Sequence, residues 1–152
     1  LGQKCADLDM QDVEGTTPIH LAAQHGHITV LNFLIGKGIS INRPNKDGWT
    51  PAHLAASNGH AEVMNLLIRI GVELNRKDHR GWMPAHLAAQ NGHVDVIRVL
   101  HQAGIDLDTP TSDGITPMHV GAQNGHVQML AVLHQAGADL NRQDNKGRTP
   151  TH

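Results

Sequence analysis

The segment GWTPAHLAASNGH, residues 48–60, decides the fold, because close copies of it recur every 33 residues along the chain. Its proline is Pro51, and four further prolines keep the same spacing and a matching Pro-x-His context: Pro18, Pro84, Pro117 and Pro150. A fixed period without insertions predicts one small structural unit stacked on copies of itself. Such a stack has an extended surface rather than an enclosed pocket, so binding is expected before catalysis.

The local signals within one unit predict a turn followed by two helices. Residues 12–15 end in glycine and are typical of a turn. Thr17 is expected to cap a first helix that has Pro18 at its first position and ends near Gly26. A second helix follows and ends at Gly38, after which the chain runs out as an extended loop or hairpin. The apolar positions of this second helix have helical spacing: Ile28, Val30, Leu31, Leu34 and Ile35.

A turn, two helices and a hairpin within 33 residues, with Thr-Pro-x-His-x-Ala-Ala in the first helix, resembles the ankyrin repeat. The resemblance extends over the whole chain. It implies an all-α solenoid of stacked helix-turn-helix units with protruding β-hairpin or loop tips. We expect a single domain, residues 1–152, in which both ends fall inside a repeat, as in a piece of a longer array. Its expected parts are the end of a repeat at 1–11, full repeats at 12–44, 45–77, 78–110 and 111–143, and the start of a further repeat at 144–152.

Composition excludes several classes of partner and compartment. The net charge is −2, and the sequence lacks the clustered Lys and Arg of a nucleic-acid-binding surface, so no nucleic-acid partner is expected. No apolar run reaches the ~18 residues of a membrane span, and we expect no membrane insertion. The one cysteine, Cys5, excludes internal disulfides, and it takes a place that glycine holds in the other repeats. A reducing compartment fits this composition, so we expect an intracellular, cytoplasmic monomer.

Thirteen histidines raise the hypothesis of a metal site. Nine of them repeat in two columns, one after each Pro-x and one at the start of each second helix, and both columns are interpreted as structural. Equivalent positions in stacked repeats should lie about 10 Å apart, far beyond a zinc–nitrogen bond of about 2 Å. The remaining four are expected to be partly exposed, with a local pH- or metal-sensitive edge as the alternative: His25, His79, His101 and His134.

No constellation in the sequence indicates catalysis or a cofactor. None of the serines lies in a Gly-x-Ser-x-Gly elbow. Neither a Gly-x-Gly-x-x-Gly motif nor a phosphate-binding loop is present. The carboxylates are scattered over turns rather than paired in an apolar setting. We therefore expect no enzyme activity, no cofactor and no metal.

The resemblance implies that partner proteins contact the hairpin tips and the exposed side of the first helix. One tip column varies among fixed neighbours and contains both tryptophans: Thr16, Trp49, Trp82, Ile115 and Arg148. Trp49 and Trp82 are expected side by side on the concave rim, continued by Ile115, as an interface hot spot. The predicted site also includes the charged tip residues Lys46, Asp47, His79, Arg80 and Asp113. An uncharged row beside them completes it: Ser57, Asn58, Gln90 and Asn91.

Three alternatives stay open at this level. Each tryptophan could pack flat on its own hairpin and shield the repeat. The two indoles could belong to an aromatic cage for methyl-lysine, although Phe33 falls on the core pattern and leaves the cage without a third wall. The whole array could be a rigid spacer or intramolecular scaffold within a larger enzyme, channel or secreted bacterial effector.

Two departures from the repeat predict weaker units toward the C-terminal end. Met83 stands where the other units have a capping threonine, a loss of roughly 0.5–2 kcal/mol. Gly121 replaces alanine within the first helix of the fourth unit, at about 1 kcal/mol. Hydrogen exchange is therefore expected to be fastest toward that end. Asn75 and Asn141 match positions that are hydroxylated in some similar repeats, although a structural role in the turn is the firmer expectation.

Overall fold

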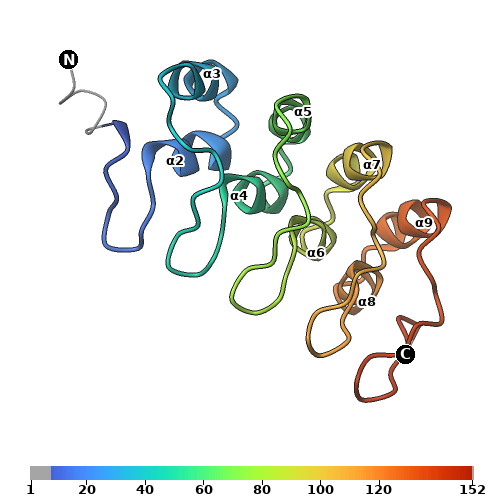
Figure 1. Ribbon diagram of the computed structural model, residues 1–152. Coiled ribbons are helices and arrows are strands. Elements are labelled where there is room, and N and C mark those ends of the chain that lie inside the picture. Colours follow the sequence, from blue (N-terminus) through green and yellow to red (C-terminus); the bar gives the residue numbers. More distant parts are fainter. Residues whose placement is uncertain (1–7, 152) are drawn as a thin grey trace.

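The structure is a computed structural model that describes residues 8–151, in which helices α2 to α9 form four antiparallel pairs. The first helices of the pairs are α2 (Pro18–Gln24), α4 (Pro51–Ser57), α6 (Pro84–Gln90) and α8 (Pro117–Gln123). The second helices are α3 (Ile28–Gly36), α5 (Ala61–Arg69), α7 (Val94–Gln102) and α9 (Val127–Gln135). Figure 1 shows them as two parallel rows, with loops projecting beyond the row of first helices. The described residues contain no strand, and the all-α solenoid is confirmed.

A reciprocal pair of hydrogen bonds starts the first helix of the second and fourth repeats, and the second repeat illustrates it. The N–H of His53 donates to Thr50 Oγ1 (3.4 Å), and the N–H of Thr50 donates to His53 Nδ1 (3.2 Å). This is a capping box with histidine in the place of the usual glutamate. His53 Nε2 lies 3.0 Å from the carbonyl oxygen of Trp82 in the next repeat. Because an N–H can only donate and a carbonyl can only accept, the ring is held as the neutral tautomer with its proton on Nε2.

The same bond joins each repeat to the next. His20 reaches the carbonyl of Trp49 and His86 that of Ile115, at 3.2 and 2.9 Å. His119 completes the series with the carbonyl of Arg148 at 2.9 Å. Burial in this position lowers the pKa of His86 from 6.5 to about 4, and it also lowers the pKa values of His20 and His53. Uncharged histidine is therefore part of the folded state.

A second histidine column ties the repeats together in the opposite direction. Nε2 of each ring lies 2.8–3.0 Å from a carbonyl at the end of the preceding first helix; the pairs are His60 with Gln24, His93 with Ser57 and His126 with Gln90. A Cβ on Gly59 would lie 2.6 Å from His93 Nδ1, so the ring needs glycine beneath it. The structural interpretation of both columns is confirmed for these seven histidines. His27 begins the second column but is exposed, and its ring makes no such bond among the described residues. His152 and Cys5 lie outside the described residues.

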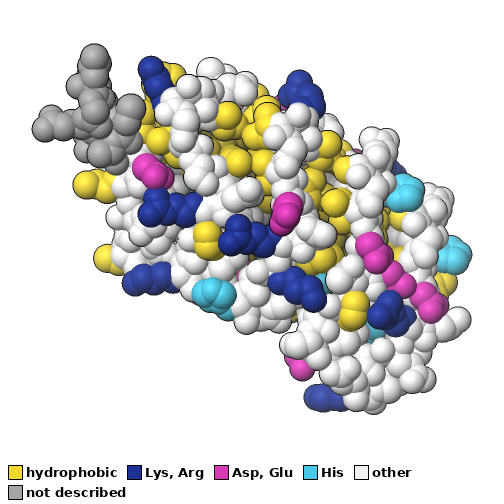
Figure 2. Space-filling model, in the orientation of Figure 1, with side chains coloured by type: hydrophobic (Ala, Val, Ile, Leu, Met, Phe, Trp, Pro, Cys, Tyr) yellow, Lys and Arg dark blue, Asp and Glu magenta, His cyan; other side chains and the backbone are white. Residues whose placement is uncertain are grey.

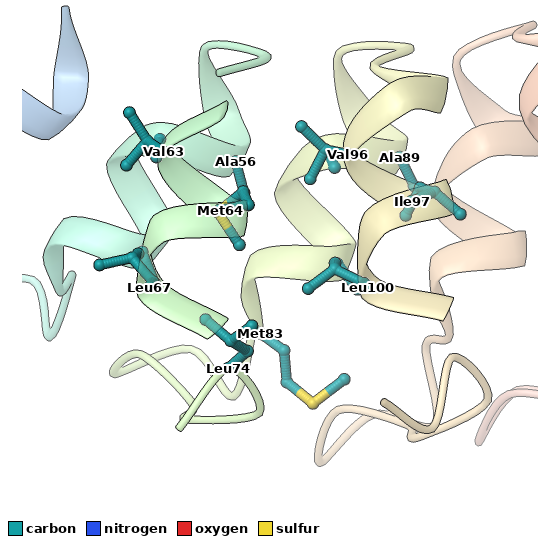
Figure 3. Packing of buried hydrophobic residues seen from close by; sticks show 14 of the residues in the cluster. Ala56, Val63, Met64, Leu67, Leu74, Met83, Ala89, Val96, Ile97 and Leu100 are labelled. Atoms are coloured by element: carbon teal, nitrogen blue, oxygen red, sulfur yellow. The ribbon is translucent and has the colours of Figure 1, made fainter. Parts of the chain in front are cut away.

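Aliphatic side chains of neighbouring second helices form the core between repeats. Figure 3 shows Val63 and Leu67 of α5 along the same stack as Val96 and Leu100 of α7, and all four are fully buried. Ala56 and its counterparts Ala23 and Ala89 are equally buried, and their small side chains let successive first helices approach closely. One continuous hydrophobic cluster therefore runs through the described stack.

The prediction that puts Val30 and Phe33 in the core is wrong. Val30 is 44% exposed and Phe33 is 54% exposed, and the Lys37 ammonium lies 5.5 Å above the Phe33 ring. Val63 and Leu66 occupy the same columns one repeat later and are buried. The column is buried only where a preceding helix pair packs on it, and among residues 8–151 no such pair precedes α2 and α3.

Candidate functional site

The five loop tips, residues 12–16, 45–49, 78–82, 111–115 and 144–148, share one hydrogen-bonded turn. In the third tip, Asp78 Oδ1 accepts the N–H groups of Arg80 and Trp82, both at 2.9 Å. The N–H of Asp78 in turn donates to the Trp82 carbonyl at 2.8 Å. The equivalent side chains in the other tips accept the same two N–H groups: Asp12, Asn45, Thr111 and Asp144. Each tip is therefore a preorganised turn rather than a free loop.

Main-chain hydrogen bonds join three of the four described pairs of adjacent tips. The N–H of Lys46 donates to the Glu14 carbonyl at 2.9 Å, and the N–H of His79 donates to the Asp47 carbonyl at 3.1 Å. The fourth and fifth tips are joined in the same way, through Asn145 and Asp113 at 2.9 Å. These bonds fix the spacing between side chains on neighbouring tips.

Four of these side chains form what we term the Trp–Arg cluster: Trp49, Asp78, Arg80 and Trp82. The Trp49 indole N–H donates to Asp78 Oδ2 at 2.9 Å, and Arg80 Nη2 lies 3.6 Å from the same oxygen. The Arg80 guanidinium lies over the Trp82 ring, 4.7 Å from its centroid. Both indoles are half-buried, and the Asp78 carboxylate is fully enclosed. The two predicted tryptophans are therefore linked through Asp78 and Arg80, with no ring contact between them among the described residues.

A hollow of about 380 Å³ opens between the second and third tips. Its lining consists of Asp47, Trp49, His79 and Arg80, all of which belong to the predicted site. A cation, a carboxylate and an indole face thus meet in one concave place at the edge of the array. Lys46 is exposed on the second tip beside the hollow, and Asp113 is exposed on the fourth tip.

Ile115 and Arg148 continue the tryptophan column with different contacts. Ile115 is half-buried against the core. Arg148 Nε donates to Asp144 Oδ2 at 2.8 Å, so it folds back on its own tip. Burial by itself would raise the pKa of the Asp144 carboxyl, but hydrogen bonds from the backbone and side chain of Arg148 and from the backbone of Lys146 lower it. Asp144 therefore stays ionised as the anchor of the fifth tip.

The uncharged row at the ends of the first helices is partly used within the fold. Asn91 Nδ2 donates to the Ser57 carbonyl at 2.8 Å and to Ser57 Oγ at 3.1 Å. Asn58 Nδ2 donates to the Leu54 carbonyl at 2.8 Å, and the main-chain carbonyl of Gln90 accepts from His126. Asn58 and Asn91 remain exposed, and within the described residues their Oδ1 atoms accept no hydrogen bond. Among the described residues, the two Asn side chains therefore keep an unbonded oxygen, and the Gln90 side-chain amide makes no hydrogen bond.

Sequence reasoning missed the residues that hold the tips in place. Asp78 and Asp144 are buried carboxylates that anchor a turn, and Asp78 also binds the Trp49 indole. The signal was present, because an Asp, Asn or Thr lies three residues before each tip glycine, where its side chain can accept backbone N–H groups. Side chains of this kind commonly accept backbone N–H groups in turns, so this column would have predicted the residues that anchor each tip.

The histidines outside the two columns do not form a metal site within residues 8–151. His25, His79, His101 and His134 are exposed, as expected. Over the part of the chain that the structure describes, no three His, Cys, Asp or Glu side chains lie close enough to hold a metal ion. Within that same part, no helix has the length and apolar character that crossing a membrane requires.

Comparison with known proteins identifies the repeat. The family described as "Ankyrin repeats (3 copies)" matches residues 1–78 and again residues 70–144. A comparison with curated proteins finds no significant match. Because the two family matches together span nearly the entire sequence, the chain belongs to the ankyrin-repeat family.

Proposed function

We propose that this chain is a protein–protein interaction module whose partner binds the loop tips and the adjoining ends of the first helices. Ankyrin repeats are in general protein-interaction modules and are typically non-catalytic. The observation that carries the assignment to the tips is the Trp–Arg cluster. It combines two indoles and a guanidinium on turns that the fold already holds rigid.

Tryptophan and arginine are the side chains most enriched in interface hot spots. A preorganised turn loses little conformational entropy on binding, so more of the contact energy is available for affinity. The surrounding charges are mixed: Figure 2 shows Lys and Arg interspersed with Asp and Glu over the face that carries the loops. Such a surface suits a protein with its own mixed charges, rather than a nucleic acid that requires a basic field.

The second candidate is a rigid spacer or scaffold, and the two histidine columns favour it. Their bonds tie neighbouring repeats in both directions along the stack. In that role the Trp49 indole would serve the fold alone, through its bond to Asp78 on the next tip. For either role we propose a cytoplasmic monomer, on the grounds of the single cysteine and the mixed surface.

An affinity capture from cell lysate distinguishes these functions. The native chain is compared with a Trp49→Ala/Trp82→Ala variant and with Arg98→Ala, a control on the exposed face of α7. Circular dichroism first establishes that all three have the same helix content. Partner binding at the tips predicts a protein captured by the native chain and by Arg98→Ala but lost with the double variant. Equal capture by all three would move the interface elsewhere, and no specific capture would favour the spacer.

A further inference from the structure

The junction between the third and fourth tips differs from the junction before it in one acceptor. At the earlier junction, the Trp49 indole donates to the carboxylate of Asp78 on the next tip. Trp82 is the equivalent indole at the later junction, and Thr111 occupies the position equivalent to Asp78. Thr111 Oγ1 is the only side-chain oxygen there, and it already accepts the N–H groups of Asp113 and Ile115 at 3.3 and 3.2 Å. Among residues 8–151, the Trp82 indole N–H consequently has no hydrogen-bond acceptor.

The third and fourth tips also lie farther apart at Gly81 than the other adjacent tips do at the equivalent glycines, and no main-chain hydrogen bond joins them within residues 8–151. No hydrogen bond joins the N–H of Ser112 to the carbonyl of Arg80, although such a bond joins the other described pairs of adjacent tips. A Cβ on Gly81 would lie 3.4 Å from Ser112 N, whereas a Cβ on Gly48 would lie 2.8 Å from His79 N. The arginine bonds that span other junctions, such as Arg76 to the Asn42 carbonyl at 2.9 Å, have no counterpart at Thr109. A single longer bond, from Lys77 Nζ to the Pro110 carbonyl at 3.4 Å, joins the two loops beside these tips instead. A ligand group that reaches the half-buried Trp82 indole would lie between these two tips.

The positive charge of Arg80 above the Trp82 ring indicates which kind of ligand group fits this junction. The Arg80 guanidinium lies over the ring, and 57% of this side chain is exposed. An unpaired indole donor beside an exposed guanidinium matches an acceptor that carries negative charge. The arrangement of Trp49, Asp78 and Arg80 within this same protein shows how a carboxylate satisfies both donors.

We propose that the junction between the third and fourth tips binds a carboxylate of the partner protein, an Asp or Glu side chain that accepts from the Trp82 indole and pairs with Arg80. This inference rests on the proposed function and names the chemistry that the partner brings to it. Asp113 holds on the fourth tip the place that Arg80 holds on the third, so its charge opposes the ligand and limits the affinity.

The two tryptophans provide a direct test, because a ¹⁵N-labelled chain has only two indole N–H signals in its NMR spectrum. Trp82→Phe assigns them. The probe is N-acetyl-aspartate N-methylamide, and the matched neutral control is N-acetyl-asparagine N-methylamide. The aspartate probe should shift the Trp82 signal with saturation in roughly the millimolar range, and the Trp49 signal and the control should show no such response.

Three variants locate the binding group. Thr111→Asp supplies the missing acceptor from within the chain, and Asp already occupies this position in three other tips, so the turn is retained. Its Trp82 signal should no longer respond to the probe, and its indole proton should exchange more slowly. Arg80→Gln should weaken the response about two- to fivefold, as expected for an exposed ion pair, and Asp113→Asn should strengthen it.

Equal shifts of both indoles, an equal response to the asparagine control, or an undiminished response in Thr111→Asp would overturn the inference. These outcomes are separable from a failure of the proposed function. A partner captured through the tips while the aspartate probe gives no Trp82 response would refute only the carboxylate site. A specific Trp82 response without any captured partner would refute only the wider function.

Discussion

At the scale of single residues, His86 joins three parts of the fold. Its Nδ1 accepts the N–H of Met83, its Nε2 donates to the Ile115 carbonyl of the next repeat, and the ring is fully buried. Met83 has lost the hydroxyl cap but keeps this returning bond, and its side chain is buried in the core instead. The sequence predicted the missing cap correctly, whereas the compensating bond and burial require the three-dimensional contacts.

The pH dependence of stability follows from His86. Its pKa is about 4 in the folded state and near 6.5 in the unfolded chain, so between these values the unfolded state binds more protons. Stability should therefore be fully present above pH 6.5 and fall as the pH drops toward 4, by roughly 3 kcal/mol from this residue. Urea unfolding from pH 7 to 4 measures it, and His86→Gln should flatten the slope. An imidazole titration of His86 near pH 6.5 would contradict this account.

Gly59 and Gly104 have the same left-handed backbone conformation, but only Gly59 lies against a neighbouring side chain. Replacing each with alanine therefore distinguishes the cost of backbone strain from the cost of steric crowding. Gly59 has φ +76° and would place a Cβ 2.6 Å from His93, whereas Gly104 has φ +80° and nothing within 4 Å. Gly104→Ala should cost only the left-handed strain of roughly 1–2 kcal/mol. Gly59→Ala should cost about 1–3 kcal/mol more, because the His93 ring and its bond to Ser57 must shift. Equal losses in urea unfolding would show that the ring does not select glycine here.

At the scale of elements, the loop tips differ in how they are joined. Lys46, His79 and Asn145 each donate their N–H to the preceding tip, but Ser112 makes no such bond to Arg80. The Ser112 amide should therefore exchange with solvent at least about tenfold faster than those of His79 and Asn145. Residue-resolved hydrogen exchange by NMR tests this. Equal protection of all four amides would mean that the third and fourth tips are joined as tightly as the rest.

The helices could be predicted from the sequence, but the network within the tips could not. Thr-Pro at the start and glycine at the end define each first helix, and α2 begins at the predicted Pro18. The tip column that contains Trp49 and Trp82 was recognised as variable, yet their connection through Asp78 and Arg80 depends on rotamers and spacing that a periodic pattern does not encode. That both tryptophans bind a partner stays a prediction.

At the scale of the whole molecule, position in the stack decides what a repeated residue contributes. Val30 and Val96 hold the same column, but Val30 is 44% exposed and Val96 is fully buried between repeats. Val96→Ala should cost roughly 2 kcal/mol, and Val30→Ala less than about 1 kcal/mol. Denaturant unfolding of the two variants measures the difference. Similar losses would mean that another part of the chain covers α3.

The exposed Phe33 reveals the same limit of sequence reasoning. Periodicity within α3 assigns the face on which a side chain lies, and Phe33 does lie on a face that later repeats bury. Whether that face is covered depends on the neighbouring unit, which the local pattern does not specify. Faster exchange toward the C-terminal end, expected from Met83 and Gly121, likewise stays a prediction, because it depends on coupling along the whole stack.

The most direct test of the central claim is a hydrogen–deuterium exchange footprint of the chain with its captured partner. Binding through the Trp–Arg cluster predicts strong protection at tips 45–49, 78–82 and 111–115, and little change on the outer helices α5 and α7. The Arg98→Ala control should give the same footprint. Protection confined to the outer helices, with unchanged exchange at the three tips, would contradict the claim that the tips are the binding surface.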